Sequence, residues 1–329
     1  MFSGKKVVVT GGAGFIGSHL VDLLVALGAD VTVIDNFSTG RMEFISQHEG
    51  KNGFHFVKAD LLSPESCSKH FRDSFAVFHL ASSSDIKKSA KEPRTDLEQG
   101  IVATFNVLEL MRKHDIRNFV FSSSCAVYGE TLENPIKETD GPAIPISLYG
   151  ASKLAAEGLA GAYAGTYGLS CLIYRFANVV GPRSTHGAVF DFCNKLRASP
   201  SALEVLGDGR QTKSYFLAGE CAGAMVFGAS KVLPRLSAGT EIFNIANSDW
   251  ISVREIAEIV VEESGLKGVK INYAGGPRGW PGDVPKIMLD GSKLAKLGWS
   301  PKLNSRESVR KAARLVWQES KKSGFHESH

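Results

Sequence analysis

Two residues near the middle of the chain, Tyr149 and Lys153, have types and a spacing that suit acid–base chemistry. Residues four apart on a helix share one face, and residues 152–167 show apolar side chains at helical spacing. An ammonium close to a phenol favours the phenolate and lowers the pKa of the tyrosine. We therefore expect the pair to supply a general base near neutral pH.

A serine-rich segment upstream of this helix could bring a hydroxyl to the same place. Residues 119–122 predict a strand, and Ser123 and Ser124 follow directly at its carboxyl end. A hydroxyl there can hydrogen-bond an alkoxide or a ketone. The alternative is a serine-rich turn that satisfies its own backbone.

Glycines near the start of the chain predict a loop that binds phosphate groups. Gly11, Gly14 and Gly17 lie between an apolar strand-like run at 5–10 and a helical pattern that begins at Ser18. Glycine permits a tight turn, a close approach of backbone to a pyrophosphate, and close helix–strand packing. The N-terminus of the helix then offers free N–H groups to the phosphates. This arrangement is typical of dinucleotide-binding proteins.

An acidic residue, Asp35, closes the second predicted strand at 30–34. A carboxylate at this point can bind the ribose hydroxyls of adenosine, and it would repel a 2′-phosphate. The sequence therefore favours NAD over NADP as the cofactor.

The composition is that of a globular enzyme. The chain has 329 residues, a net charge of +4 and scattered basic residues, which do not imply binding to nucleic acid. Its five cysteines are widely separated and form no C-x-x-C pair, which argues against disulfides or a zinc site and favours a reducing compartment. We expect no signal peptide, no membrane span and no bound metal, and hence a cytoplasmic location.

Strand-like and helical segments alternate along most of the chain. Further strands are expected at 53–58, 75–80 and 170–175, and a further helix at 101–114. This alternation predicts an α/β fold with a Rossmann-type, doubly wound parallel sheet, whose ligands bind beyond the carboxyl ends of the strands.

The pattern changes after residue 181, where glycines and prolines become frequent and strands become short. We expect residues 1–180 to form an NAD-binding domain to which segments at about 215–250 return. Residues 181–329 are expected to form mainly a smaller, interleaved substrate-binding region.

Taken together, these motifs resemble the extended short-chain dehydrogenase/reductase family. The matching segments are G-G-A-G-F-I-G-S-H-L at 11–20, H-L-A at 79–81, S-S-S-x-x-V-Y-G at 122–129, Y-G-A-S-K at 149–153 and R-F-A-N-V-V-G-P-R at 175–183. Within that family the chain is most similar to NAD-dependent nucleotide-sugar 4-epimerases of the UDP-glucose (UDP-galactose) type. The resemblance implies a UDP-sugar substrate and a homodimer.

The resemblance also implies roles for individual residues. Tyr149 matches the catalytic base, Lys153 its partner and a ribose ligand, and Ser124 the proton relay to the sugar O4. In the family, hydride leaves sugar C4 for NAD and returns to the other face after the 4-keto sugar has turned.

Cofactor and substrate contacts follow from the same resemblance. Cofactor contacts are expected from Gly11, Gly14, Phe15, Ile16, Gly17, Asp35, Asn36, Ser38, Gly40, Asp60, Leu61, Leu80, Ala81, Ser82, Gln99, Ser122, Tyr149, Lys153 and Phe176. Substrate contacts are expected from Ser84, Ser124, Tyr149, Asn178, Val189, Val205, Lys213, Tyr215, Arg278 and Ile287.

Some positions differ from the pattern of the family. Lys213 stands where an arginine is usual, so it can meet a phosphate only as a point charge. Gln99 replaces a common asparagine. Ile287 aligns with a residue beside the C2 substituent of the sugar, where its bulk favours UDP-glucose and UDP-galactose with some turnover of the N-acetylated pair.

Other activities on the same scaffold remain alternatives. A 4,6-dehydratase or decarboxylase would carry an acid just after the catalytic hydroxyl, where this chain has Cys125 and Ala126. A 3,5-epimerase would need a second acid–base pair, for which Cys125 and His186 are the candidates. A UDP-glucuronate 4-epimerase would use the same catalytic residues. A non-catalytic nucleotide sensor would have no need for the serine, tyrosine and lysine together.

Overall fold

The computed structural model describes residues 1–83, 91–130, 133, 135–279 and 284–322, with no side-chain description from residue 320 onward. Its centre is a seven-stranded sheet in the order β11-β6-β5-β4-β1-β2-β3, in which every neighbouring pair is parallel. The strands are β1 (Lys6–Thr10), β2 (Asp30–Asp35), β3 (Phe54–Lys58), β4 (Ala76–His79), β5 (Asn118–Ser124), β6 (Ser170–Phe176) and β11 (Gly239–Ile245). This order confirms the predicted doubly wound fold, because the strand sequence reverses direction at β1.

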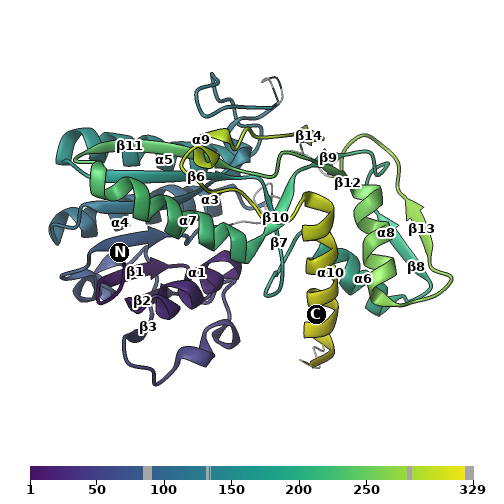
Figure 1. The fold of residues 1–329 in the computed structure, drawn as a ribbon, viewed down its shortest axis with the longest axis horizontal. Coiled ribbons are helices and arrows are strands. Elements are labelled where there is room, and N and C mark those ends of the chain that lie inside the picture. Colours follow the sequence, from purple (N-terminus) through teal and green to yellow (C-terminus); the bar gives the residue numbers. More distant parts are fainter. Residues whose placement is uncertain (84–90, 131–132, 134, 280–283, 323–329) are drawn as a thin grey trace.

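Helices cover both faces of the sheet, as its near-continuous apolar strands require. One face packs on α1 (Phe15–Ala26) and α7 (Ala218–Val232), and the other on α4 (Ala103–Lys113) and α5 (Leu148–Tyr167). Figure 1 shows α1 and α7 side by side along one side of the sheet. Alternate residues of β1 enter the two cores: Val7 and Val9 face α1, and Val8 faces α4.

The remaining elements form a smaller region beside the sheet (Figure 1). Its core is made by α6 (Ala188–Ala198), α8 (Val253–Ser264) and α10 (Ser305–Lys322) with short strands. These strands are β7 (Asn178–Val180), β8 (Ala202–Val205), β9 (Thr212–Lys213), β10 (Tyr215–Leu217), β12 (Ile251–Ser252), β13 (Lys270–Tyr273) and β14 (Lys286–Ile287). The short helix α9 (Ser292–Ala295) packs instead against β11 of the main sheet. The chain passes into this region after β6, returns to the sheet with α7 and β11, and leaves again.

Short helical turns complete the connections. The 3-10 turns are η1 (Met42–Phe44), η2 (Ser46–His48), η3 (Pro64–Ser66), η4 (Ser68–Phe71), η6 (Cys125–Val127) and η7 (Leu233–Arg235). Between α3 (Pro93–Asp96) and α4 lies a π-helical turn, η5 (Leu97–Val102). Such turns are rare and often occur near functional sites.

Two element boundaries matter for the site and differ from the sequence expectation. β5 extends to Ser124, because all three serines continue the ladder with β6 and Ser124 pairs with Phe176. The helix expected from 152 begins at Leu148, because the Ser147 hydroxyl accepts a hydrogen bond from the Gly150 N–H and caps it. Tyr149 therefore lies in the first turn of α5.

Candidate active site

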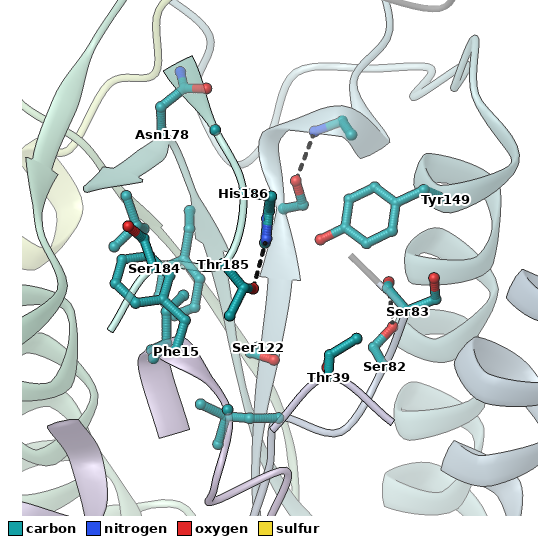
Figure 2. A pocket seen from close by; sticks show the side chains of 18 of the residues that line it. Phe15, Thr39, Ser82, Ser83, Ser122, Tyr149, Asn178, Ser184, Thr185 and His186 are labelled. Carbon is teal, nitrogen blue, oxygen red and sulfur yellow. Dashed lines mark hydrogen bonds between the residues drawn. The ribbon is translucent and has the colours of Figure 1, made fainter. Parts of the chain in front are cut away.

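A cavity of about 900 Å³ lies between the carboxyl edge of the sheet and the smaller region. Its walls come from the loop after β1, from the ends of β2, β4, β5 and β6, from residues 184–192, and from Gln211, Lys213 and Tyr215. The sheet supplies the position that the doubly wound fold predicts for a ligand. In Figure 2, Tyr149 and Ser83 lie on one wall and Asn178 and Ser184 on the other.

Tyr149, Lys153 and Ser124 meet on the wall of this cavity. The Nζ of Lys153 donates a 2.8 Å hydrogen bond to the carbonyl oxygen of Ser122 and lies 5.9 Å from the ring centre of Tyr149. The Oγ of Ser124 accepts a 3.2 Å hydrogen bond from the Ala126 N–H and interacts with the Tyr149 hydroxyl. The tyrosine side chain points into the cavity (Figure 2).

The close approach of α5 to the serine strand depends on a glycine. A Cβ placed on Gly150 would lie 2.5 Å from the carbonyl oxygen of Ala126. No side chain fits there, so glycine beside Tyr149 lets the first turn of α5 rest directly on η6, the turn that follows β5.

Burial sets the proton affinities of the pair. Burial raises the pKa of Tyr149 to about 12, although the hydrogen bond with Ser124 acts to lower it. Burial lowers the pKa of Lys153 to about 7, although the negative charges of Glu157 and Asp96 act to raise it. The sequence predicts that the ammonium of Lys153 lowers the pKa of the Tyr149 phenol. In the structure the larger effect is desolvation of the phenolate, because the ammonium of Lys153 is itself destabilised by burial and is directed at a carbonyl oxygen.

A buried polar network fixes the serine strand to α5. Glu157, one turn after Lys153, accepts a hydrogen bond of 2.5 Å from the Ser123 hydroxyl and forms an ion pair with Arg175 at 2.6 Å. Arg175 also donates to the Tyr128 hydroxyl at 2.8 Å. Because Ser123 stands between the carbonyl that binds Lys153 and the hydroxyl of Ser124, this network holds all three catalytic candidates in register.

The glycine-rich loop and Asp35 form a cradle that fits a dinucleotide. Gly11 has a φ of +68°, and a Cβ there would lie 2.6 Å from the backbone nitrogen of Ala81. A Cβ on Gly17 would overlap the carbonyl oxygen of Gly11. Asp35 is held at the end of β2, where its carboxylate accepts from the N–H groups of Ala13 (3.0 Å) and Phe37 (2.8 Å). The backbone of the glycine-rich loop is thus exposed for close approach of a pyrophosphate. The carboxylate of Asp35 stands at the position from which an acid binds the ribose hydroxyls.

Most of the residues expected in the site line this one cavity. They are Gly11, Gly14, Phe15, Ile16, Gly17, Asp35, Asn36, Ser38, Leu61, Leu80, Ala81, Ser82, Gln99, Ser122, Ser124, Tyr149, Lys153, Phe176, Asn178, Val189, Lys213, Tyr215 and Ile287. Asn178 and Tyr215 are direct partners between β7 and β10, which explains how two distant segments reach the same wall.

The other expected residues lie outside the lining. Gly40 packs against the Asp35 carboxylate, and Asp60 accepts a hydrogen bond from the Asn36 amide at 3.1 Å behind the cavity wall. Val205 is fully buried in the core of the smaller region, where alternation turns it away and Leu206 lines the cavity instead. Arg278 forms an ion pair with Glu130 at 2.5 Å, although its neighbour Gly279 reaches the cavity. Ser84 lies outside the described residues.

The structure adds lining residues that the sequence analysis did not assign to the site. Cys125 and His186 both line the cavity, and Figure 2 shows the His186 ring between Tyr149 and the Asn178 wall. Gln211 is also in the wall, two residues before Lys213. This two-residue spacing is the signal that the sequence carries for Gln211, but the extended segment is too short for its alternation to be read without the structure.

Comparison with known proteins places this site in a family. The family model described as "NAD dependent epimerase/dehydratase family" matches residues 7–246, which include the glycine loop, the serine strand and the Tyr149–Lys153 helix. This chain belongs to the NAD-dependent epimerase/dehydratase family.

Relatives of this epimerase/dehydratase differ in their sugars. A UDP-glucose 4-epimerase of Mycolicibacterium smegmatis is 32% identical over 93% of this chain and 96% of its own length. A crystal structure of a UDP-galactose 4-epimerase is 41% identical over 95% of this chain and 99% of its own, with a TM-score of 0.86. A UDP-glucuronic acid 4-epimerase of Bacillus cereus, in complex with UDP-glucuronic acid and NAD, is 27% identical over 95% and 99%, with a TM-score of 0.85.

These comparisons show an NAD-dependent enzyme of the nucleotide-sugar epimerase/dehydratase class with an extended short-chain dehydrogenase/reductase fold. In the part of the chain that the structure describes, no helix is both long and apolar enough to cross a membrane. Within the same residues, no group of three or more His, Cys, Asp or Glu side chains could bind a metal ion.

Proposed function

We propose that this enzyme interconverts the C4 epimers of a UDP-hexose, with UDP-glucose and UDP-galactose as the preferred pair. The observation that carries the proposal is the meeting of Ser124, Tyr149 and Lys153 at one point of the cavity wall, with Cys125 and Ala126, rather than an acid, directly after the serine. Such a site can move the proton of a secondary hydroxyl, and it lacks the adjacent acid that would eliminate water.

Each residue has a defined task in this reaction. Bound NAD would accept the hydride of sugar C4 and return it, and its nicotinamide would add positive charge beside the phenol. Tyr149 takes the proton of the O4 hydroxyl and later returns it. Ser124 donates to the same oxygen while it carries negative charge. Lys153, fixed by the Ser122 carbonyl, binds the ribose and stabilises the phenolate.

The substrate-binding wall supports a nucleoside diphosphate with an uncharged sugar. Asn178 and Lys213 are proposed to bind the diphosphate. Among the described lining residues the only Lys or Arg side chains are Lys153 and Lys213. A uronate carboxylate would therefore have no arginine partner in that part of the wall, which favours a neutral hexose over UDP-glucuronate.

Burial of Cys125 weighs against the 3,5-epimerase alternative. Desolvation raises the pKa of its thiol, although the charge of Lys213 acts in the opposite direction. A protonated, partly buried thiol is a poor base for proton abstraction at C3 or C5.

The remaining parts of the proposal concern organisation. We propose that residues 1–180, with about 215–250, bind NAD and that 181–329 mainly bind the substrate. We further propose a cytoplasmic homodimer. Its support is the set of exposed apolar side chains on the π-turn, α4 and α5, namely Leu97, Val102, Phe105, Leu148 and Tyr167.

Proton NMR of the products tests the reaction. The protein is incubated with UDP-glucose, UDP-N-acetylglucosamine or UDP-glucuronate in separate samples. We expect inversion at C4 with retention of all ring hydroxyls, fastest for UDP-glucose. A 4-keto-6-deoxy sugar would establish a dehydratase, loss of carbon dioxide from the uronate a decarboxylase, and inversion at C3 or C5 the 3,5-epimerase. Unchanged sugars in all three samples would favour the sensor.

Substrate choice is predicted to depend on Ile287. This residue is buried, lines the cavity and pairs with Lys213 across β14 and β9. Ile287→Tyr should lower kcat/KM for the N-acetylated pair relative to UDP-glucose by about tenfold or more, because an apolar wall discriminates by roughly 1–3 kcal/mol per methylene-sized change. Ile287→Leu, which conserves volume, is the control. If the ratio of kcat/KM values is the same in Ile287→Tyr and in the parent, Ile287 does not face the C2 substituent.

A further inference from the structure

The side-chain amide of Gln211 is buried, and none of the residues that the structure describes forms a hydrogen bond with it. The residue is 4% exposed, and both its Oε1 and its Nε2 lack a partner among those described residues. Buried polar groups are nearly always hydrogen-bonded, and one that is not destabilises the fold unless a bound molecule satisfies it. Gln211 lines the same cavity as Tyr149, so a molecule in that cavity can reach the amide.

Gln211 belongs to a row of three cavity-facing side chains. Gln211, Lys213 and Tyr215 line the cavity, whereas Thr212 and Ser214 do not. Alternation of this kind is the rule for an extended chain, in which successive side chains point to opposite sides. The orientation of Gln211 toward the cavity therefore follows from the course of the backbone.

The three side chains of the row have different neighbours. Tyr215 pairs with Asn178, and Lys213 is close enough to Cys125 to influence the pKa of its thiol. Gln211 lies in the smaller region, where its backbone carbonyl oxygen accepts a 3.0 Å hydrogen bond from the backbone N–H of Val253. Its amide rests against Gly207, and a Cβ at Gly207 would overlap it.

This order can be matched to the parts of a UDP-sugar, and the step rests on the proposed function. With the sugar at Tyr149 and the diphosphate at Lys213, the nucleoside is the part that extends to Gln211. Leu206 and Val253 line the cavity beside it and offer apolar contact to a planar base.

We propose that Gln211 is a substrate-binding residue that hydrogen-bonds the nucleoside of the UDP-sugar through its side-chain amide. The carboxamide has one acceptor oxygen and two N–H donors. It can pair with the N3–H and a carbonyl of uracil, or with the hydroxyls of the ribose. Glycine at 207 leaves the space that this amide occupies.

Gln211→Met tests the assignment, because methionine has a similar length and cannot form these hydrogen bonds. Binding of UDP is measured by calorimetry, and thermal unfolding is measured without nucleotide. We expect UDP affinity to fall by about tenfold, the effect of leaving one buried hydrogen-bonding group unpaired. The midpoint of unfolding should stay equal to that of the parent or rise, because an unsatisfied amide has been removed. Thr212→Val, at the next position, whose side chain does not line the cavity, should leave UDP affinity unchanged.

Two analogues identify the group that Gln211 contacts. UDP methylated at N3 of uracil and 2′-deoxy-UDP are each compared with UDP in the parent and in Gln211→Met. The analogue that lacks the contacted group should bind less tightly than UDP to the parent, and that difference should disappear in the variant.

Several results would overturn the proposal. One such result is equal UDP affinity in the parent and in Gln211→Met. Another is that Gln211→Met binds both analogues less tightly than UDP by the same factors as the parent does. A lower unfolding midpoint with unchanged UDP affinity would make Gln211 a structural residue. Failure of the parent itself to bind UDP would instead refute the proposed function, so the two failures can be told apart.

Discussion

Tyr149→Phe is expected to lower turnover by about 10²–10⁴-fold, the usual contribution of a positioned general base or acid. The affinity for the nucleotide-sugar should change little, because the ring and its packing are kept. Turnover is measured by product NMR or a coupled assay, and affinity by calorimetry with UDP-galactose. The two readouts separate loss of proton transfer from loss of binding.

A second tyrosine on the same helix provides a matched control. Tyr167 is exposed at the far end of α5, away from the cavity. Tyr167→Phe should keep the parental rate. If Tyr149→Phe retained more than half of that rate, Tyr149 could not be the base.

Lys153→Met is expected to cause a loss of turnover comparable to that of Tyr149→Phe. The lysine is 3% exposed, and its ammonium is held by the Ser122 carbonyl beside the phenol. Without it, the phenolate loses the positive charge that the protein provides. Lys231→Met, which removes an exposed lysine of α7, is the control and should keep full activity.

The same variant should change how stability depends on pH. Burial lowers the pKa of Lys153 to about 7 in the folded protein, whereas an unfolded lysine has a pKa of about 10.4. Between these values the unfolded chain binds more protons, so the destabilising effect of Lys153 is complete below about pH 7 and disappears toward about pH 10. The unfolding free energy of the parent should therefore rise relative to Lys153→Met over that range, by at most about 1.4 kcal/mol per pH unit.

Denaturant unfolding of both proteins between pH 7 and 10 checks this expectation. Lys231→Met should follow the parent at every pH. Parallel curves for the parent and Lys153→Met would show that the lysine has an ordinary pKa in the folded protein.

The sequence allowed most of the sheet to be predicted, because parallel strands buried on both faces are apolar throughout. The strands at β1, β2 and β6 lie within one or two residues of the expected ranges. The end of β5 was harder to predict, since the expected strand stops at Ser122 and a serine-rich segment is also compatible with a turn. Only pairing with β6 keeps these polar residues extended, and pairing is a property of the whole fold.

The candidate site was predictable where backbone chemistry dictates residue type. Glycine at 11 and 17 and an acid at 35 follow from local requirements that a sequence displays. The burial of Tyr149 and Lys153 does not follow from local sequence. That burial raises the pKa of the phenol, whereas the sequence predicts that it is lowered. The exclusion of Val205 and the inclusion of Gln211 depend on which side of short strands faces the cavity, and strands of two to four residues give too little alternation to read in advance.

The position of β11 in the sequence determines which truncated forms of this protein can stay folded and unaggregated. β11 is the edge strand of the sheet and pairs with β6, all seven residues of which are buried. The ribosome translates β11 more than sixty residues after the end of β6. A protein cut near residue 180 would keep the cofactor cradle but present an apolar, unpaired strand, which is a template for aggregation. Nascent chains on the ribosome pass through the same state until residue 245 has emerged, so chaperone demand should fall sharply at that point of synthesis.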